Sequence, residues 1–438
     1  MTPALLIRLR PLGPWRYGPD EGGRDRVDNL YRSDRLYSAL TLAFGRLGIL
    51  DEWLEATARA AQPAVAFSSL FPFQGDTLFI MPPATLWPPP AAALRMSSPV
   101  FQTKVRWRST RFAPIALVET LLLGQKVLAE QWVADAASGC LLRRDRPQSS
   151  PFRVVVRTNV AVDRLGSTVE PHSTACVEFE PAAGLWTVVV FSDKEAETLW
   201  KPRLRAAFRL LADSGFGARR SSGWGLAAEP EFQDGTWPAI LLPKVARAAA
   251  TQRPPQESNH EGPPLHWLLS LYSPAATDDI DWSNGHYSTI VRGGRVESPA
   301  GTGAEKKLVR MVAEGSVIAS AKALVGTAVD VAPDGFTHPV YRSGFALSLL
   351  IPPIVFSAEP APVETASEPE PETDVSPNEP VPAETESEPE TKPHGEAKAL
   401  TVEEPRTEAL PEESASNTSE PETDAPEPVE PASPVHPE

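Results

Sequence analysis

The chain has 438 residues and a formal net charge of −16 at pH 7. Its two cysteines, Cys140 and Cys176, are too few for a disulfide framework and do not have the spacing of a zinc site. No run of about 18 uncharged apolar residues occurs, so no membrane span is expected, and Met1–Arg10 lacks the layout of a signal peptide. These features favour a protein of the reducing cytoplasm with no membrane partner.

The acidic charge is concentrated in residues 358–438, which hold 23 acidic residues, 3 basic residues and no aromatic residue. A segment of this composition cannot bury enough apolar surface to offset the entropy of ordering, so we predict a disordered acidic Pro/Glu-rich tail. The other 357 residues carry 34 acidic and 38 basic side chains, a net charge of +4. A mildly basic body permits an RNA partner without proving one.

In chain order, Ala4–Arg10 is predicted to be a strand and Pro11–Asn29 a loop. A helix should follow, with Ser33 as its N-cap and Gly48 after its last turn. Its buried face is expected to hold Leu36, Leu40, Phe44 and Leu47. A second helix is predicted over 51–61, then strands over 64–67 and 77–81 joined by an aromatic-rich turn.

Prolines break residues 82–90, so an irregular insertion is predicted over 82–150, with a helix over 118–134. Strands are expected over 153–159, 174–179 and 185–191, with Gly184 in the hairpin between the last two. A helix over 202–213 and a strand over 226–232 follow. This order predicts an α+β fold whose first domain, 1–245, is a ferredoxin-like (RRM-type) unit with insertions. A linker (246–264) and a second, similar domain (265–357) with a short helix over 305–313 complete the prediction.

The most informative segment is the loop 215–225, between the predicted helix and strand, and we call it the Gly-rich loop. Glycines at these positions let the backbone turn and approach a ligand closely, while the arginines suit phosphate. The Walker and dinucleotide motifs are excluded because both precede a helix. A plain turn is the alternative. The candidate RNA-binding residues of the loop are Gly215, Gly217, Arg219, Arg220, Ser221, Ser222, Gly223 and Gly225.

Two Gly-hydrophobic-Gly units separated by five partly basic residues resemble the hallmark of the RAMP superfamily of CRISPR RNA-binding proteins. Within it, the chain is most similar to the subunit-four group of type III-A (Csm) effector complexes. The resemblance covers about residues 4–352, and the tail has no counterpart in the family. Four further segments carry the resemblance: Leu30–Leu40, Arg157–Arg164, Met311–Ser316 and His338–Gly344.

The resemblance implies a non-catalytic subunit without a cofactor or a metal that holds the repeat-derived 5′ tag of a CRISPR RNA. Its partners would be that RNA, the large polymerase/cyclase-like subunit and a backbone subunit, with target RNA contacted indirectly. The insertion over 82–150 would lie where the family has a thumb that wedges into the guide–target duplex.

Further candidates lie outside the Gly-rich loop, and each has a structural alternative. Arg106, Trp107 and Arg108 could bind phosphates and stack on a base, or form a solvated basic segment whose tryptophan packs inward. Arg24 and Arg26 could clamp RNA from the neighbouring loop, or be ordinary loop arginines. Arg32 and Ser33 could form a phosphate seat at a helix N-terminus, or merely cap the helix.

Three more residues or groups leave the choice between a functional and a structural role open. Trp224 could stack on a base or fill the core. His338 could be a ligand or a structural residue. Lys306, Lys307 and Arg310 could border RNA or form a solvated face.

Two other functional classes remain open. A RAMP-fold endoribonuclease could use an N-terminal histidine, but no histidine precedes His172. A loop aspartate could serve instead, and Asp20, Asp25 and Asp28 lie in the corresponding loop. The second class is a protein–protein scaffold in which the glycines serve packing alone.

Overall fold

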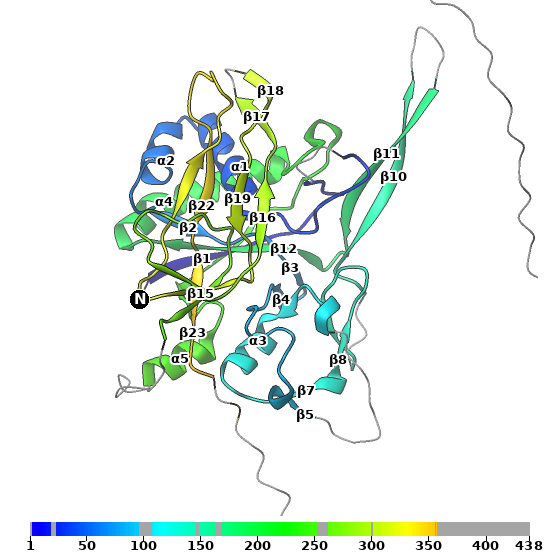
Figure 1. Ribbon diagram of the computed structural model, residues 1–438. Coiled ribbons are helices and arrows are strands. Elements are labelled where there is room, and N and C mark those ends of the chain that lie inside the picture. The colour runs from blue at the N-terminus through cyan, green and yellow to red at the C-terminus, as the bar shows by residue number, and fades with distance from the viewer. Residues whose placement is uncertain are drawn as a thin grey trace, which may run out of the picture. The chain divides into compact units, whose positions relative to one another are not determined.

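The computed structural model describes residues 2–18, 23–95, 107–145, 149–162, 169–251, 262–298, 301–354 and 356. All of these lie in one compact unit, Met1–Val363 (Figure 1). The predicted tail, 358–438, lies outside the described residues.

A mixed α/β architecture is built on antiparallel sheets, as predicted. The main sheet runs in the order β13 (Glu231–Trp237), β1 (Thr2–Leu9), β12 (Ala183–Phe191), β3 (Phe71–Gln74), β4 (Thr77–Ile80) and β6 (Ala113–Pro114), with β2 (Val65–Phe67) also paired to β12. Residues 4–7 of β1 are all buried. Because successive side chains point to opposite faces, both faces of the sheet are covered.

The predicted strand over 4–10 is confirmed, whereas the aromatic-rich turn is wrong, because Phe71–Gln74 pairs with β12 as a strand.

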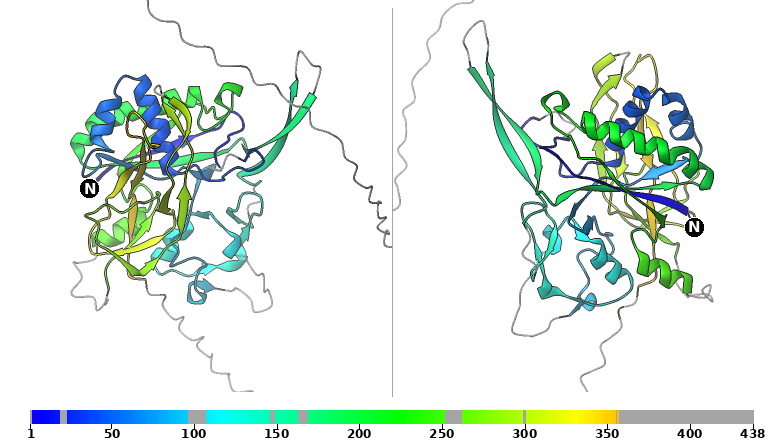
Figure 2. Two further views of the ribbon diagram at one scale, coloured as in Figure 1. Left: turned by 45° about the horizontal axis from the view of Figure 1, so that its top comes forward. Right: turned by 180° about the vertical axis from the view of Figure 1, so that it is seen from behind.

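Two helices pack together beside this sheet, α1 (Ser33–Arg46) and α4 (Lys194–Ser214) (Figure 2). The Asp193 carboxylate caps α4 by accepting a 2.8 Å hydrogen bond from the Ala196 N–H. Helix α2 (Leu50–Ala56) contributes Trp53, whose ring centroid lies 4.7 Å from that of Phe44 and 5.4 Å from that of Trp200. The three helices are thus joined by buried aromatic rings.

The start of α1 differs from the prediction. Arg32 is the N-cap and Ser33 is the first helical residue. Leu47, expected on the buried face, is 40% exposed because the helix ends at Arg46.

The insertion is irregular, as predicted, but its helix is shorter. Its elements are η1 (Ala91–Ala93), β5 (Leu94–Arg95), η2 (Trp107–Ser109), α3 (Ile115–Leu122), β7 (Val127–Leu128), η3 (Ala129–Gln131), β8 (Trp132–Ala134) and β9 (Leu141–Arg143). The helix expected over 118–134 ends at Leu122, because Gly124 adopts a φ of +68° that stops it.

Two long strands, β10 (Phe152–Val162) and β11 (Val169–Phe179), pair with each other along their length and extend away from the main sheet (Figures 1 and 2). Val177 of β11 also forms a backbone bridge with Trp15. The hairpin expected at Gly184 is wrong. That glycine lies inside β12, where a Cβ would come 2.2 Å from the Leu9 carbonyl oxygen and 2.8 Å from the Phe73 ring. Close packing, rather than a turn, explains the residue.

Within residues 262–298 and 301–354 the chain forms strands but no helix. One sheet has the order β15 (Ile280–His286), β20 (Val317–Ser320), β14 (Leu265–Leu268) and β23 (Ser348–Ile351). Three two-stranded pairs accompany it: β16 (Thr289–Arg292) with β19 (Val309–Val312), β17 (Arg295–Ser298) with β18 (Gly301–Glu305), and β21 (Gly326–Asp330) with β22 (Tyr341–Phe345). The predicted helix over 305–313 is therefore wrong.

The two predicted domains share a large hydrophobic core, and the C-terminal part also has a smaller buried cluster of its own. Trp267, Val317 and Phe345 belong to the same buried cluster as Leu5 of β1 and Leu40 of α1. The predicted linker begins inside helix α5 (Pro243–Thr251), and most of its remainder lies outside the described residues. This shared core holds the C-terminal strands against α1.

Candidate nucleic-acid interface

The Gly-rich loop follows α4 and is held against the segment that follows β1. The Ala218 N–H donates to the Arg16 carbonyl at 2.8 Å, and the Gly225 N–H donates to the Pro14 carbonyl at 3.0 Å. The Phe216 N–H donates to the Gly225 carbonyl at 2.9 Å, so the two Gly-hydrophobic-Gly units bond to each other. These amides are therefore engaged inside the protein, and the loop is a packed structure rather than an open cradle of N–H groups. The strand predicted over 226–232 begins only at Glu231.

Two of its glycines are required for different reasons. Gly217 has a φ of +76°, and a Cβ there would lie 2.3 Å from the Arg16 carbonyl oxygen. Gly223 has the same φ of +76°, but a Cβ there would meet nothing within 4 Å. Gly217 is therefore required both by its left-handed backbone conformation and by its close packing against Arg16. Gly223 is required by its left-handed conformation alone.

The part of the loop that faces outward is the single 3₁₀ turn η4 (Arg220–Ser222). Ser221 and Ser222 are exposed, and Arg219 and Arg220 are half-buried. Arg219 enters the turn with a φ of +63°, a left-handed conformation that is uncommon outside glycine. The four predicted polar residues therefore do lie together at an accessible turn.

The two arginines of the loop have partners that hold their side chains. The Arg219 Nη2 lies 3.2 Å from both the His172 Nε2 and the Thr174 Oγ1 of β11. Arg220 forms an ion pair with Glu297 of β17 at 2.5 Å. One arginine therefore contacts the long hairpin and the other contacts the C-terminal strands.

Trp224 packs inward, in agreement with the core alternative. It is 9% exposed, and the guanidinium carbons of Arg157 and Arg219 lie 6.0 and 5.9 Å from its ring centroid. These are cation–π distances. Trp224 thus packs against the guanidinium groups of two arginines instead of stacking on a base.

Arg16 joins the Gly-rich loop to the loop that contains Arg24 and Arg26. Its buried guanidinium donates to the carbonyls of Gly23, Arg24, Arg26 and Ala175 at 2.6–3.1 Å. Burial, with Arg219 nearby, lowers its pKa. Arg24 and Arg26 are exposed. The predicted second basic loop therefore does adjoin the first, through an arginine that no sequence motif singled out.

Arg32 and Ser33 occupy a buried ion network and are not accessible to RNA. Arg32 pairs with Glu314, which also accepts a 2.5 Å hydrogen bond from the Ser69 hydroxyl. The Ser33 hydroxyl accepts from the Leu271 N–H at 3.0 Å. Their exposed fractions are 6% and 2%, so the prediction of a phosphate seat at this helix start is wrong.

The neighbouring Asp34 is the centre of a second buried pairing. Its carboxylate accepts hydrogen bonds from Arg292 at 3.0 and 3.2 Å and pairs with Arg342. Burial alone would raise the pKa of Asp34, but the Arg292 and Arg342 guanidiniums outweigh it and hold this pKa well below its usual value. Three of the segments that carried the resemblance, 30–40, 311–316 and 338–344, thus meet in buried contacts between α1 and the C-terminal strands.

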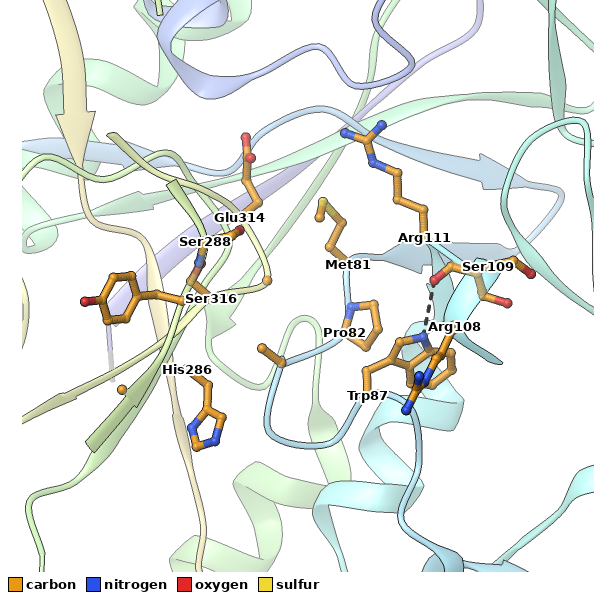
Figure 3. A pocket seen from close by; sticks show the side chains of 15 residues that line it. Met81, Pro82, Trp87, Arg108, Ser109, Arg111, His286, Ser288, Glu314 and Ser316 are labelled. Atoms are coloured by element: carbon orange, nitrogen blue, oxygen red, sulfur yellow. Dashed lines mark hydrogen bonds between the residues drawn. The ribbon is translucent and has the colours of Figure 1, made fainter. Parts of the chain in front are cut away.

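In the basic stretch of the insertion, Arg106 lies outside the described residues. Trp107 is only 8% exposed and meets Trp87 edge to face at 5.4 Å, so its predicted role in stacking on a base is wrong. Arg108 is exposed, whereas Arg111 is half-buried and lies 3.9 Å from Asp28. Arg108 and Arg111 line a pocket of about 710 Å³ between the insertion and the C-terminal strands (Figure 3).

The remaining candidates are dispersed. His338 is exposed and lies 2.7 Å from the Ser298 Oγ. Lys307 pairs with Asp334 at 2.7 Å, and Arg310 is an exposed residue of β19, so the predicted helical basic face does not exist.

Of the loop acids, Asp20 lies outside the described residues and Asp25 is exposed. Asp28 lies 3.4 Å from Arg32 and 3.9 Å from Arg35 and Arg111. Within the described residues no group of three His, Cys, Asp or Glu side chains is arranged to hold a metal ion. No described helix is long and apolar enough to cross a membrane.

Among solved structures, the chain is similar to one in the "Crystal structure of Csm3-Csm4 subcomplex in the type III-A CRISPR-Cas interference complex". The identity is 14%, the TM-score is 0.48, and the match covers 79% of this chain and 99% of that one. A chain in the "Crystal structure of Csm1-Csm4 cassette in complex with cA4" is 17% identical with a TM-score of 0.45, over 80% of this chain and 98% of that one. No curated protein matches the chain.

The family resemblance is tested more directly by the sequence of the C-terminal strands. Residues 262–351 match the family model of the CRISPR Csm4 C-terminal domain. This range includes Arg292, Glu314 and Arg342, which pair with the start of α1. The resemblance that the motifs indicated is thereby confirmed over these residues, which are similar to the C-terminal domain of Csm4 of type III CRISPR systems.

Proposed function

We propose that this protein is the non-catalytic RNA-binding subunit of a type III-A CRISPR effector complex and holds the 5′ repeat-derived tag of the CRISPR RNA. The match of residues 262–351 to the Csm4 C-terminal domain supports the proposal that the protein belongs to this complex. The order β13-β1-β12-β3 of the main sheet supports a ferredoxin-like first domain, since the first strand lies between the last and the third strands of that motif. A second ferredoxin-like domain is not part of the proposal, because residues 301–354 and 262–298 form strands only.

The observation that carries RNA binding is the accessible turn η4 beside the exposed Arg24. Arg219 and Arg220 precede the exposed hydroxyls of Ser221 and Ser222 on a backbone that is fixed by packing, so little backbone freedom is lost when they bind a phosphate. Burial and then the nearby Arg219 and Arg24 lower the pKa of Arg16 while Asp25 opposes them, so three guanidiniums and one carboxylate lie close together here. Such a surface suits the backbone of a single strand.

The partners we propose are CRISPR RNA, the large Csm1 subunit and the backbone Csm3 subunit, in the cytoplasm. The two protein partners are proposed from the similar chains in solved Csm1–Csm4 and Csm3–Csm4 assemblies. Target RNA would be contacted only through the guide.

The test replaces Arg219 and Arg220 together by alanine in the full chain. Each charge-assisted contact contributes about 1.5–3 kcal/mol, so affinity for a tag-containing RNA should fall at least tenfold and its salt dependence should flatten. Arg209→Ala is the control, because Arg209 is an arginine of α4 outside the loop that, like Arg220, forms an ion pair, here with Glu229, although it is more exposed. Equal affinity and equal salt slope in the double variant and the control would contradict the proposal.

The rival endoribonuclease is tested by incubating the protein with guide and target RNA, with and without divalent ions. We expect intact RNA, because Asp28 is already engaged by Arg32 and Arg111. Asp25 is an exposed acid. If the protein cleaves RNA and Asp25→Ala abolishes the cleavage, the endoribonuclease is established instead.

A further inference from the structure

The pocket between the insertion and the C-terminal strands is built as a small-molecule site. Its volume of about 710 Å³ is within the range of roughly 300–1,000 Å³ that such sites occupy. One side is apolar and contains Met81, Pro82 and Trp87, and the other side chains around it are polar or charged (Figure 3).

Hydrogen bonds hold these walls in place. The Ala84 N–H donates to the Gly315 carbonyl at 2.9 Å, which ties the start of the insertion to the 314–316 turn. The Trp87 Nε1 donates to the carbonyls of Trp107 and Thr110 at 3.0 and 3.2 Å, which fixes the turn that presents Arg108. The Ser316 Oγ accepts from the Ser288 N–H at 3.2 Å. The pocket is therefore preformed.

The charges on its rim favour an anion. Arg108 and His286 are exposed, and they come from the insertion and from β15. Arg111 adds a second guanidinium, although Asp28 lies 3.9 Å away. The one acidic residue in the lining, Glu314, is already paired with Arg32 and bonded to Ser69. The open part of the pocket therefore presents the Arg108 guanidinium and the His286 imidazole, and its described lining residues include no unpaired carboxylate.

We propose that this pocket binds one nucleotide, with the base against Met81, Pro82 and Trp87 and the phosphate at Arg108 and His286. An apolar wall beside a cationic rim matches the two halves of a nucleotide and does not match a bare anion or an apolar molecule. The inference deepens the proposed function and rests on it, because it assigns a second contact to the bound RNA.

The two RNA contacts are connected through the protein. Arg111 of the pocket bonds to the Asn29 side chain. Asn29 follows Asp28, whose N–H donates to the Tyr17 carbonyl at 2.9 Å, next to Arg16 under the Gly-rich loop. Residues 16–17 and 28–29 therefore link the two proposed contacts by hydrogen bonds.

The experiment uses the full chain and the double variant Arg108→Ala/His286→Ala, which changes two exposed side chains and should fold normally. Arg144→Ala is the control, since Arg144 is an exposed arginine of the same insertion outside the pocket. Short single-stranded RNA carrying one 4-thiouridine at successive positions is crosslinked, and the labelled peptides are identified by mass spectrometry. We expect one position to crosslink to peptides containing Trp87 or Arg108, and about tenfold weaker RNA binding in the double variant.

A second arm uses the fluorescent mononucleotide methylanthraniloyl-AMP to distinguish a free nucleotide from a nucleotide within RNA. Binding of this probe that the double variant loses, without an RNA crosslink in the pocket, would assign the pocket to a free nucleotide. No crosslink, no probe binding and unchanged RNA affinity would overturn the proposal. If only Arg219→Ala/Arg220→Ala weakens RNA binding, the pocket proposal alone fails; if only the pocket variant does, the proposed role of η4 fails.

Discussion

The Gly-rich loop and the start of α1 both present arginine next to serine, yet their environments are opposite. At η4, Ser221 and Ser222 are exposed. At α1, Arg32 and Ser33 are buried under Glu314 and Leu271, which lie in segments between the C-terminal strands. Similar residue types thus form an accessible polar turn in one place and an internal ion network in the other. What differs is whether a distant segment covers them.

The comparison predicts different consequences for substitutions in the two regions. Changes at α1 should affect folding first, since an uncompensated buried charge is costly. Changes at the outward turn should affect RNA binding while leaving folding nearly unchanged.

The largest effect is expected from Asp34→Asn, which leaves Arg292 and Arg342 buried without their carboxylate. Breaking a buried pair in this way costs about 3–5 kcal/mol, and urea denaturation should show that loss in the free energy of unfolding. Asp51→Asn is the matched control, because Asp51 is an exposed acid in the first turn of α2. A loss no larger than that of the control would mean that the network does not join the two parts of the chain.

The same network predicts a dependence of stability on pH. The folded-state pKa of Asp34 lies below its unfolded value of about 3.9. Its ionised form therefore stabilises the fold fully above that value, and the stabilisation is lost as the pH falls through the folded pKa. Below about pH 4 the free energy of unfolding should fall more steeply in the wild type than in Asp34→Asn. Parallel curves would contradict the assignment.

Gly217→Ala and Gly223→Ala separate packing from backbone conformation within the Gly-rich loop. Both place a side chain at a positive φ, which costs about 1–2 kcal/mol. Only Gly217→Ala also meets the Arg16 carbonyl, at 2.3 Å. We expect a clearly lower melting temperature and weaker RNA binding for Gly217→Ala, and a smaller change in both for Gly223→Ala. Equal effects would show that contact with Arg16 is unimportant.

Arg24→Ala should produce a smaller change that is confined to RNA binding. Arg24 is exposed, so its removal should leave the melting temperature unchanged. Loss of one phosphate contact should reduce the slope of log affinity against log salt by about one. Arg46→Ala, at an exposed position in the last turn of α1, serves as the control and should not change the slope. A slope that is equally unaffected by Arg24→Ala would remove this loop from the interface.

The smallest effect is expected from ending the chain at Phe356. The removed part includes residues 358–438, which have a net charge of −20 and no aromatic residue. Thermal unfolding should therefore be unchanged. Affinity for non-specific RNA should stay equal or rise slightly, because acidic charge is removed. Aggregation, or failure to join the large-subunit partner, would show that the tail is an interaction element.

The sequence by itself determined those features that depend on neighbouring residues along the chain. The alternation of β10 and β11 and the charge separation between body and tail needed no tertiary information. The positive-φ glycines 217 and 223 were recognisable because glycine is the residue that tolerates that conformation. Glutamate 314, in contrast, gave no sign that it would be buried against Arg32.

The tertiary structure decided which side chains are covered. Whether each tryptophan stacks on a base or packs inward depends on a residue distant in the sequence, Trp87 for Trp107 and Arg157 for Trp224. The helix expected over 305–313 became β18 and β19 because strand pairing with β17 and β16 supplied hydrogen bonds that a short isolated helix lacks. Burial and strand pairing are set by contacts between distant segments, and residue type and spacing alone do not specify them.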